Sequence, residues 1–286
     1  MIVVTGATGN VGRPLVRALA AAGEQITAVS RGIPGAPAPD GVRYRQADLN
    51  DAESLRPVLD GADALFLHDG GGGVQGFSVS AILDGAKAGG VGRVVLLSSQ
   101  GVGTRPESAS HGVVGRARED EVRQSGLEWT ILRAGGFDSN AHAWAESVRA
   151  RRTVSAPFGD IGLPTVDPDD IAEVAAAVLR GQGHDGQGHN GQVYELTGPA
   201  LSTPRQMAGV IGAALGEPVR FVEQSTDEAR ALMLQFMPEP VVATTLEILG
   251  APTAAELRIS PDIEQLLGRP ARTFADWAGR NIAAFG

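Results

Sequence analysis

The sequence contains no cysteine among its 286 residues. A disulfide framework, a thiolate nucleophile and a zinc–thiolate site are therefore excluded. No apolar run is long enough to cross a bilayer. The first short strand runs directly into a glycine-rich turn, which is unlike a secretory signal. We therefore expect a cytoplasmic protein that does not associate with membranes.

Lysine and tyrosine are nearly absent. Lys87 is the only lysine, and Tyr44 and Tyr194 are the only tyrosines. The net charge is −9, which argues against binding to nucleic acid or to an anionic membrane. Apolar residues make up 43% of the chain, which is enough for one large α/β domain, alone or with a smaller lobe.

The N-terminus reads MIVVTGATGNVG, a turn between a β-branched strand at 2–5 and an amphipathic helix at 11–22. We expect Gly6 to permit a tight exit from the strand, Gly9 to let the backbone approach a pyrophosphate, and Gly12 to let the helix pack close to the sheet. The helix N-terminus then offers free N–H groups to phosphates. The alternative is an ordinary glycine-rich turn. The residues expected to contact a dinucleotide are Gly6, Thr8, Gly9, Asn10, Val11 and Gly12.

Short apolar runs alternate with helix-length segments along the first two thirds of the chain. The expected strands are 2–5, 25–30, 42–46, 64–68, 93–98, 128–133 and 192–196, and the expected helices between them are 11–22, 51–59, 77–88, 108–125 and 169–179. This rhythm predicts an α/β protein, a doubly wound Rossmann fold with a mostly parallel sheet and a smaller, mainly helical C-terminal lobe. We assign 1–135 with 164–198 to the nucleotide-binding core. Residues 136–163 with 199–286 are assigned to a substrate-binding lobe over the carboxyl ends of the strands.

The end of the second strand indicates which dinucleotide binds. NAD-binding sites of this kind usually carry a carboxylate there for the ribose 2′-OH, whereas this chain has Ser30 and Arg31. A hydroxyl and a guanidinium suit a 2′-phosphate. Arg13, just after the third glycine, is placed to join them. We therefore predict NADPH/NADP⁺ rather than NADH as the cofactor; the alternative is that Arg31 is only a solvated loop charge.

Further cofactor contacts are expected where the third and fourth strands end. Asp48 and Leu49 are placed to meet the adenine, although Asp48 suits a helix cap nearly as well. His68 and Asp69 should flank the cofactor at the carboxyl end of the fourth strand. His68 is a candidate general acid there, but a lone histidine at a strand end is more often a hydrogen-bonded wall residue.

Five segments carry a family resemblance: TGATGNVG at 5–12, SSQG at 98–101, SGLEWTILRAGGFDSN at 125–140, PTVDPDDIAEVAAAVL at 164–179 and YELTGP at 194–199. With them the chain resembles the NmrA-like branch of the atypical short-chain dehydrogenase/reductases over nearly its whole length. Within the branch it is similar to the atypical angucyclinone (aromatic polyketide) ketoreductases. The resemblance implies a Rossmann core and a small C-terminal lobe. Members include NADPH-dependent quinone and enone reductases, polyketide ketoreductases and non-catalytic redox sensors.

The sequence departs from the family in its proton-delivery residues. Short-chain dehydrogenases typically use a serine with a Tyr-x-x-x-Lys pair, in which the tyrosine protonates the carbonyl oxygen and the lysine lowers the pKa of the tyrosine. Here Ser98 or Ser99 stands for the serine, but residues 108–123 contain neither tyrosine nor lysine. By its spacing, His111 falls near the lysine position of the isoflavone-reductase-like members. The catalytic candidates are Ser98, Ser99 and His111.

Three functions remain open. The first is a reductase that transfers hydride from NADPH to a bulky aromatic ketone, and the resemblance implies a ketone of the angucyclinone polyketide type. The second is a general NADPH quinone or enone reductase, and the third is a non-catalytic NADP(H)-binding redox sensor. The partner expected of an enzyme here is a small-molecule aromatic substrate. Its pocket is expected to include Gln100, Phe137, Trp144, Phe158 and Phe236, although apolar residues at helical spacing more often form plain core.

Two charged features are expected to be structural. Arg133 should anchor the lobe through a carboxylate. Asp167, Asp169 and Asp170 precede an apolar-periodic run. We interpret this acidic cluster as a helix start capped by Asp169, and we expect no metal site there.

Overall fold

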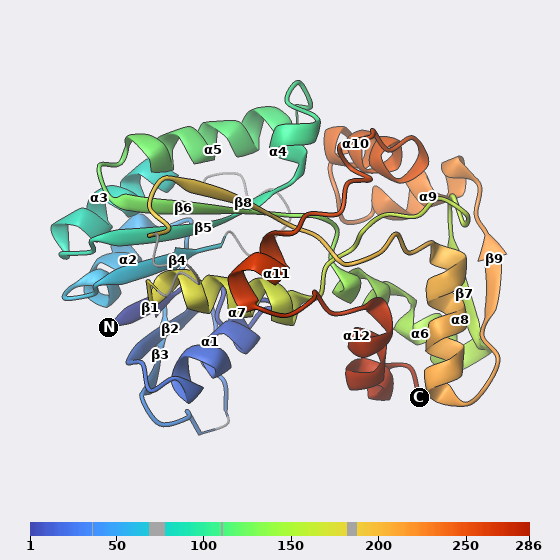
Figure 1. Ribbon diagram of the computed structural model, residues 1–286, viewed down its shortest axis with the longest axis horizontal. Coiled ribbons are helices and arrows are strands. Elements are labelled where there is room, and N and C mark those ends of the chain that lie inside the picture. Colours follow the sequence, from blue (N-terminus) through green and yellow to red (C-terminus); the bar gives the residue numbers. More distant parts are fainter. Residues whose placement is uncertain (36, 69–77, 110, 182–187) are drawn as a thin grey trace.

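The protein is described by a computed structural model that covers residues 1–35, 37–68, 78–109, 111–181 and 188–286. One parallel sheet organises most of the chain (Figure 1). Its strands are β1 (Ile2–Val4), β2 (Ile26–Ser30), β3 (Val42–Gln46), β4 (Ala64–Leu67), β5 (Arg93–Ser99), β6 (Glu128–Ala134) and β8 (Gln192–Leu196).

The strand order is β3-β2-β1-β4-β5-β6-β8, and every neighbouring pair is parallel. The order reverses at β1, where Val4 pairs with Ala28 of β2 on one side and with Phe66 of β4 on the other. Ligands of open α/β sheets bind outside the carboxyl ends of the strands at such a reversal. The expected doubly wound fold is therefore confirmed, and the sheet is wholly parallel.

Helices cover both faces of the sheet. On one face lie α1 (Gly12–Ala21) and α7 (Pro168–Leu179), and on the other lie α2 (Ala52–Leu59), α3 (Val79–Ala88) and α5 (Gly112–Gln124) (Figure 1). Each layer has its own buried apolar cluster, one including Val4, Leu15 and Ile171 and the other including Val3 and Leu55. The alternation of Val3 and Val4 between the two clusters follows from the two-residue period of a strand.

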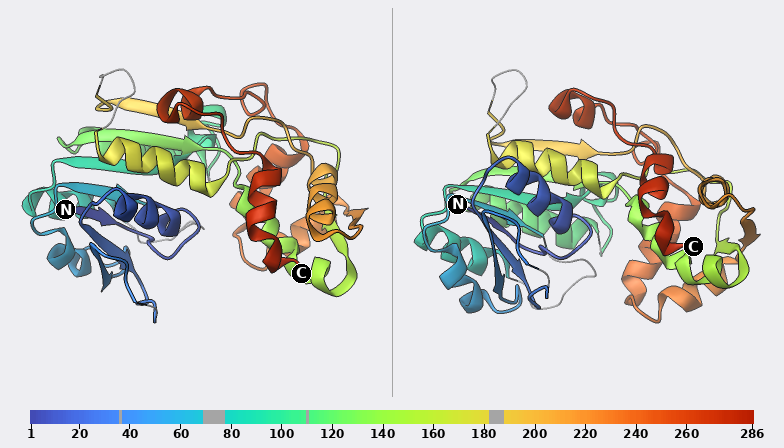
Figure 2. Two further views of the ribbon diagram at one scale, coloured as in Figure 1. Left: turned by 60° about the horizontal axis from the view of Figure 1, so that its bottom comes forward. Right: turned by 90° about the horizontal axis from the view of Figure 1, so that it is seen from below.

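The remaining elements lie beyond the carboxyl ends of the strands (Figures 1 and 2). This mainly helical part comprises η1 (Asp138–Trp144), α6 (Ala145–Arg151), β7 (Thr153–Ala156), α8 (Pro204–Leu215), β9 (Arg220–Glu223), α9 (Thr226–Met233), α10 (Glu239–Gly250), α12 (Phe274–Asn281) and η2 (Ile282–Ala284). The expected helical C-terminal part is confirmed. Its core gathers Val148, Ile211 and Trp277, and a smaller cluster joins α9 to α10.

Three short elements were not expected from the sequence. They are α4 (Gly101–Thr104), β9, and α11 (Asp262–Leu267). Strand β9 exists because it pairs with β7 in a separate two-stranded parallel sheet. Helix α11 packs against α7 and β8, and its Ile263 is buried in the same cluster as Leu15. This stretch of 199–286 thus lies on the Rossmann part of the molecule.

Ion pairs fasten the C-terminal segment to α7. Asp170, on α7, is fully buried, and it accepts hydrogen bonds from Arg269 (2.7 Å) and from the backbone N–H of Arg272 (2.6 Å). The guanidinium of Arg272 also pairs with Asp170. Glu173, one turn further along α7, pairs with both arginines at 2.5 Å. Within the residues described, no helix is long and apolar enough to cross a membrane.

We predict that Asp170→Ala lowers the free energy of unfolding by about 3 kcal/mol, because it removes the buried acceptor of the Arg272 backbone N–H and leaves Glu173 as the remaining carboxylate for both arginines. Urea denaturation followed by circular dichroism measures the change. Asp40→Ala is the matched control, since Asp40 is exposed. A loss for Asp170→Ala no larger than that for the control would contradict the fastening role.

Candidate functional site

The glycine turn brings the start of α1 against the end of β1. Gly6 has a φ of +62°, and a Cβ there would lie 3.1 Å from Cδ2 of His68. A Cβ on Gly12 would lie only 2.1 Å from the carbonyl oxygen of Gly6. Gly12 therefore packs against the backbone that leaves β1, a close approach that a side chain would prevent. Within the first turn of α1, the N–H groups of Arg13 and Leu15 donate to the carbonyl oxygens of Gly9 (3.1 Å) and Val11 (3.0 Å), and Pro14 has no N–H. A pyrophosphate is therefore expected at the backbone N–H groups of the turn that precede Arg13.

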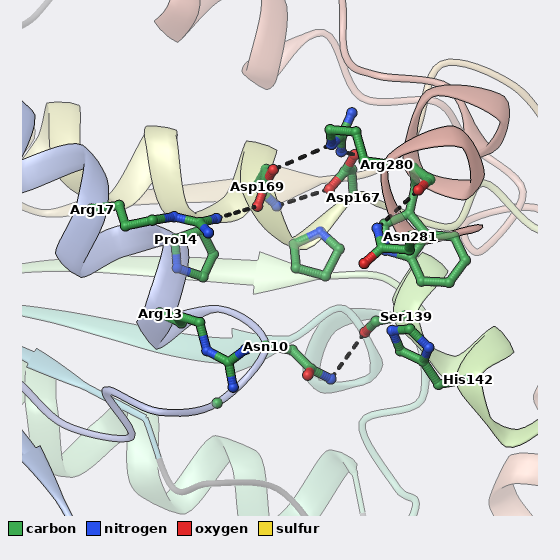
Figure 3. A pocket seen from close by; sticks show the side chains of 13 residues that line it. Asn10, Arg13, Pro14, Arg17, Ser139, His142, Asp167, Asp169, Arg280 and Asn281 are labelled. Atoms are coloured by element: carbon green, nitrogen blue, oxygen red, sulfur yellow. Dashed lines mark hydrogen bonds and ion pairs between the residues drawn. The ribbon is translucent and has the colours of Figure 1, made fainter. Parts of the chain in front are cut away.

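Polar side chains of the turn contact both the turn itself and η1. Arg13 Nη2 donates to the carbonyl oxygen of Thr8 (3.0 Å), so the guanidinium folds back over the turn. Asn10 Nδ2 donates to Ser139 Oγ of η1 (3.1 Å), as Figure 3 shows. Val11 is fully buried. The Asn10–Ser139 bond directly connects the turn to the C-terminal part of the molecule.

The ends of β2 and β3 lie side by side. Ser30 Oγ donates to the carbonyl oxygen of Gly32 (2.6 Å), and Arg31 is exposed. Asp48 Oδ1 accepts from the backbone N–H of Asn50 (3.0 Å) and from its side-chain amide (3.1 Å). Asp48 therefore shapes the turn before α2, which is close to the capping alternative. Leu49 packs against the apolar cluster on the α2 and α3 side of the sheet.

His68 follows β4 and lies against Gly6. Its backbone N–H donates to Thr5 Oγ1 (2.8 Å), and the Thr5 hydroxyl donates to the carbonyl oxygen of Phe66 (2.9 Å). These bonds place the His68 ring beside the glycine turn, where a wall of the cofactor site is expected. Asp69 lies outside the described residues.

The two serines at the end of β5 differ in their surroundings. Ser98 Oγ donates to Glu119 Oε1 (2.7 Å), and this fully buried carboxylate of α5 also accepts from Arg133 (2.7 and 2.9 Å) and Arg123 (2.8 Å). Burial acts to raise the pKa of Glu119, but the hydrogen bonds from Arg133, Ser98 and Arg123 outweigh it and lower the pKa. Ser98 therefore belongs to a buried ionic network, and its hydroxyl proton is held by Glu119.

The same network corrects the expectation for Arg133. Its carboxylate partner is Glu119 on α5, so Arg133 ties β6 to a helix of the Rossmann part. The lobe is held by other ion pairs. No pattern in the sequence marked Glu119 as a buried acid, because it lies in a stretch of α5 that is otherwise charged and polar.

Ser99 and His111 both lie beside Gly101. Ser99 Oγ accepts from the backbone N–H of Gly101 (3.1 Å). A Cβ on Gly101 would lie 3.3 Å from Ser99 Oγ and 2.8 Å from His111 Cβ. His111 occupies the N-cap position of α5, where its backbone N–H donates to Ser108 Oγ (3.1 Å). Burial and the charge of Arg105 lower the pKa of His111 against the opposing effect of Glu256, which favours the neutral form of its imidazole.

A segment of the C-terminal part lies against this strand end. Glu256 is buried and accepts from Arg105 Nε (2.7 Å) and Nη2 (3.0 Å), and also from Thr104 (3.2 Å). Gln100 is buried and donates weakly to the carbonyl oxygen of Ala255 (3.4 Å). The segment around Glu256 therefore closes one side of the space next to His111.

The five residues expected to line a substrate pocket are placed in different surroundings. Phe137 packs against the core cluster of the α1 face, and Trp144 packs into the lobe core. Phe158, with a φ of +53°, packs against the α9–α10 cluster, while Phe236 is 71% exposed. Gln100 alone lies next to Ser99. A pocket shared by all five stays a prediction.

A cleft of about 480 Å³ opens between the N-terminal ends of α1 and α7 and the lobe (Figure 3). It is lined by Gly9, Asn10, Arg13, Pro14, Arg17, Ser139, His142, Asp167, Pro168, Asp169, Trp277, Arg280 and Asn281. Asp167 caps α7 by accepting from the backbone N–H of Asp169 (2.9 Å), which corrects the expected cap by Asp169. Arg280 pairs with both acids, and Arg17 lies 3.7 Å from Asp169. The two acids of the lining are thus paired with arginines, and Arg13 is the arginine of the lining that lies beside the glycine turn.

Asp138 is a buried acid that the sequence gave no reason to single out. It is 1% exposed; its Oδ1 accepts from Thr165 Oγ1 (2.6 Å), and its Oδ2 has no hydrogen-bond partner among the described residues. Burial raises the pKa of Asp138 to about 7; Asp167 and Asp170 add to the rise, while Thr165 and Arg280 oppose it. The carboxyl group therefore stays largely protonated below neutral pH, next to the residue that holds Asn10.

The comparison with known proteins agrees with this geometry. The family described as NAD(P)H-binding matches residues 6–182. The (4-alkanoyl-5-oxo-2,5-dihydrofuran-3-yl)methyl phosphate reductase of Streptomyces griseus subsp. griseus is 35% identical, over 100% of this chain and 99% of its own. The NAD(P)H azoreductase of Xenophilus azovorans is 31% identical over the same shares. The crystal structure of an NADPH-dependent quinone oxidoreductase from Escherichia coli, complexed with NADPH, is 25% identical with a TM-score of 0.75, covering 98% of this chain and 99% of that one.

We predict that Asp138→Asn changes how stability depends on pH. The pKa of Asp138 is about 7 in the folded protein against a usual 3.8. Between these values the unfolded chain loses the proton and the folded protein keeps it, so stability falls as pH rises. The variant should remove this loss, which amounts to at most about 1.4 kcal/mol per pH unit.

Unfolding free energies of both proteins at pH 4.5, 6 and 7.5 measure this difference. Asp40→Asn is the control, because it removes an exposed acid. Parallel pH profiles for the wild type and Asp138→Asn would show that Asp138 titrates normally.

Proposed function

The chain belongs to the NAD(P)H-binding family, as its NmrA-like resemblance implied, and it is an NADPH-dependent oxidoreductase; we propose that it reduces a conjugated carbonyl compound of the quinone or enone class. The observation that carries this proposal is the scarcity of proton donors at the end of β5. Ser98 is held by Glu119, and the tyrosine and lysine of the usual triad are absent from α5. Ser99 and His111 are polar side chains that lie beside Gly101.

Different residues of the chain have different roles in the proposed reaction. NADPH, when bound, supplies the hydride. The backbone N–H groups of the glycine turn that precede Arg13 would hold the pyrophosphate. Ser99 and the neutral imidazole of His111 stand where the acceptor oxygen is expected, and each offers a hydrogen bond to the negative charge that develops there. Neither group is a strong acid, so an acceptor that spreads the charge over a conjugated system suits this site best.

The relatives support acceptors of this kind. The Streptomyces griseus protein is named as a reductase of a dihydrofuranone that carries an alkanoyl group, and the Escherichia coli structure is named as a quinone oxidoreductase. The Xenophilus azovorans protein is named for azo compounds. Their shared feature is an unsaturated, electron-poor acceptor, and we extend that feature to this chain.

A bulky aromatic ketone of the angucyclinone polyketide type is the second candidate. Helices α9 and α10 share only a small buried cluster, centred on Val242 and Leu246, with Phe158, Met233 and Met237 packed at its edge. Methionine side chains adapt readily to irregular shapes, so this pair of helices can adjust around a large ring system. A ketone with a neighbouring phenol would supply the missing hydrogen bond to its own oxygen.

The acceptor class is tested by following NADPH oxidation at 340 nm with 1,4-naphthoquinone, 2-cyclohexenone, 1-tetralone and 8-hydroxy-1-tetralone. We expect turnover with the quinone or the enone and little with 1-tetralone. Reduction of 8-hydroxy-1-tetralone alone would instead select the ketoreductase. Tight NADPH binding without turnover of any compound would contradict both and support a redox sensor.

We predict that Ser99→Ala and His111→Ala each lower kcat about a hundredfold, the usual contribution of one positioned donor. The Kd of NADPH should stay within about twofold of the wild-type value, because neither residue lies at the glycine turn. His111→Gln, which keeps an N–H donor, should recover part of the rate.

Ser80→Ala, an exposed site on α3, is the control for these substitutions. Ser98→Ala separates the roles of the two serines. It should lower the free energy of unfolding, because the bond to Glu119 is lost, and it should lower kcat less than Ser99→Ala does. Full activity in both Ser99→Ala and His111→Ala would show that the acceptor takes its proton from water.

A further inference from the structure

Strand β3 forms one edge of the sheet and presents two arginines on a single face. Arg43 and Arg45 are exposed, whereas Val42 and Tyr44, which alternate with them, pack against the core cluster of the α1 face. In the part of the chain that the structure describes, neither guanidinium pairs with a carboxylate. In a chain with a net charge of −9, two neighbouring uncompensated cations on one strand call for an explanation.

Protection of the sheet edge explains part of this pattern. Charged side chains on an edge strand discourage pairing with another chain. That role requires only that the arginines be exposed, and it treats Arg43 and Arg45 alike. Their positions along the strand, however, are not equivalent.

The strand register places Arg45 near the cofactor edge of the sheet. Arg45 pairs with Val29, and Gln46 pairs with Ser30, the last residue of β2. Parallel strands lie about 4.8 Å apart and rise about 3.3 Å per residue, which puts the Cα of Arg45 about 8 Å and the Cα of Arg43 about 14 Å from that of Arg31. Two arginine side chains starting 8 Å apart can reach one phosphate between them.

The face of the sheet suits both arginines, so only the position along the strand distinguishes Arg45. Residues paired across parallel strands point to the same side, and Val29 belongs to the apolar cluster on the α2 and α3 side. Leu49, which follows β3 and is expected to meet the adenine, packs against the same cluster. Arg45 therefore projects on the side of the sheet where the adenosine end of the dinucleotide is expected.

We propose that Arg45 is a second guanidinium for the 2′-phosphate of NADPH and sets cofactor preference together with Arg31. The inference rests on the proposed role of Arg31 at this phosphate. The 2′-phosphate is a dianion near neutral pH, and two guanidiniums on opposite sides neutralise it with fixed donor geometry. Arg31 directly follows β2 and Arg45 lies on the adjacent strand β3, so the pairing of these strands sets the approximate separation of the two residues.

The test measures the Kd of NADPH and of NADH by isothermal titration calorimetry for Arg45→Ala, Arg31→Ala, the double variant and Arg43→Ala. We expect Arg45→Ala to weaken NADPH binding about tenfold, as loss of a charged hydrogen bond does, and to leave NADH binding unchanged. The loss should shrink at high salt. Arg43→Ala, equally exposed and two residues further from the strand end, should bind both cofactors as the wild type does.

Equal weakening of NADPH and NADH by Arg45→Ala would overturn the proposal, and so would an Arg43→Ala effect as large as that of Arg45→Ala. A double variant that loses no more than Arg31→Ala alone would support it, because one phosphate held by both groups makes their effects interdependent. Unchanged NADPH preference in Arg31→Ala would remove the premise. None of these outcomes depends on acceptor turnover, so failure of the proposed substrate class is recognised separately.

Discussion

The site depends on one close approach of backbone to backbone. The first residue of α1 lies so near the carbonyl group of Gly6 that a Cβ at Gly12 would fall 2.1 Å from its oxygen. This contact fixes the direction in which α1 leaves the turn and therefore the direction of its N-terminal end. It also brings Gly6 against His68, at the end of the neighbouring strand. A pyrophosphate site, the wall beside it and the packing of α1 thus follow from the same constraint.

Buried charges hold the rest of the molecule around that turn. Asp170 pairs with two arginines of the C-terminal segment, and Glu256 pairs with Arg105. Glu119 gathers Ser98 and two more arginines at the ends of β5 and β6. The chain has almost no lysine, and arginine suits these positions because its planar donors satisfy several acceptors at once. The hydroxyl of Ser98 donates to Glu119, whereas Ser99 lies with His111 beside Gly101.

Much of the fold could be predicted from sequence because the signals are local. The apolar runs that became β1 to β6 and the periodic segment of α7 are each set by neighbouring residues. The glycine turn was recognised with its strand and helix, and the missing carboxylate after Ser30 pointed to the phosphorylated cofactor. Strand β9 escaped prediction because RFVE becomes a strand only by pairing with β7. Helix α11 escaped because its six residues are ordered by contact with α7 and β8.

The sequence by itself determined the parallel sheet, the glycine turn and the class of cofactor, because each is written in residues that are adjacent in the chain. Only the tertiary structure decided which acids are buried and what they hold. Glu119 and Arg133 form their ion pair although they are 14 residues apart in the sequence. Asp138 accepts its hydrogen bond from Thr165, which is 27 residues away. Burial, ionisation and the orientation of Ser98 and Ser99 arise from such long-range contacts. No local pattern of residue types can specify them.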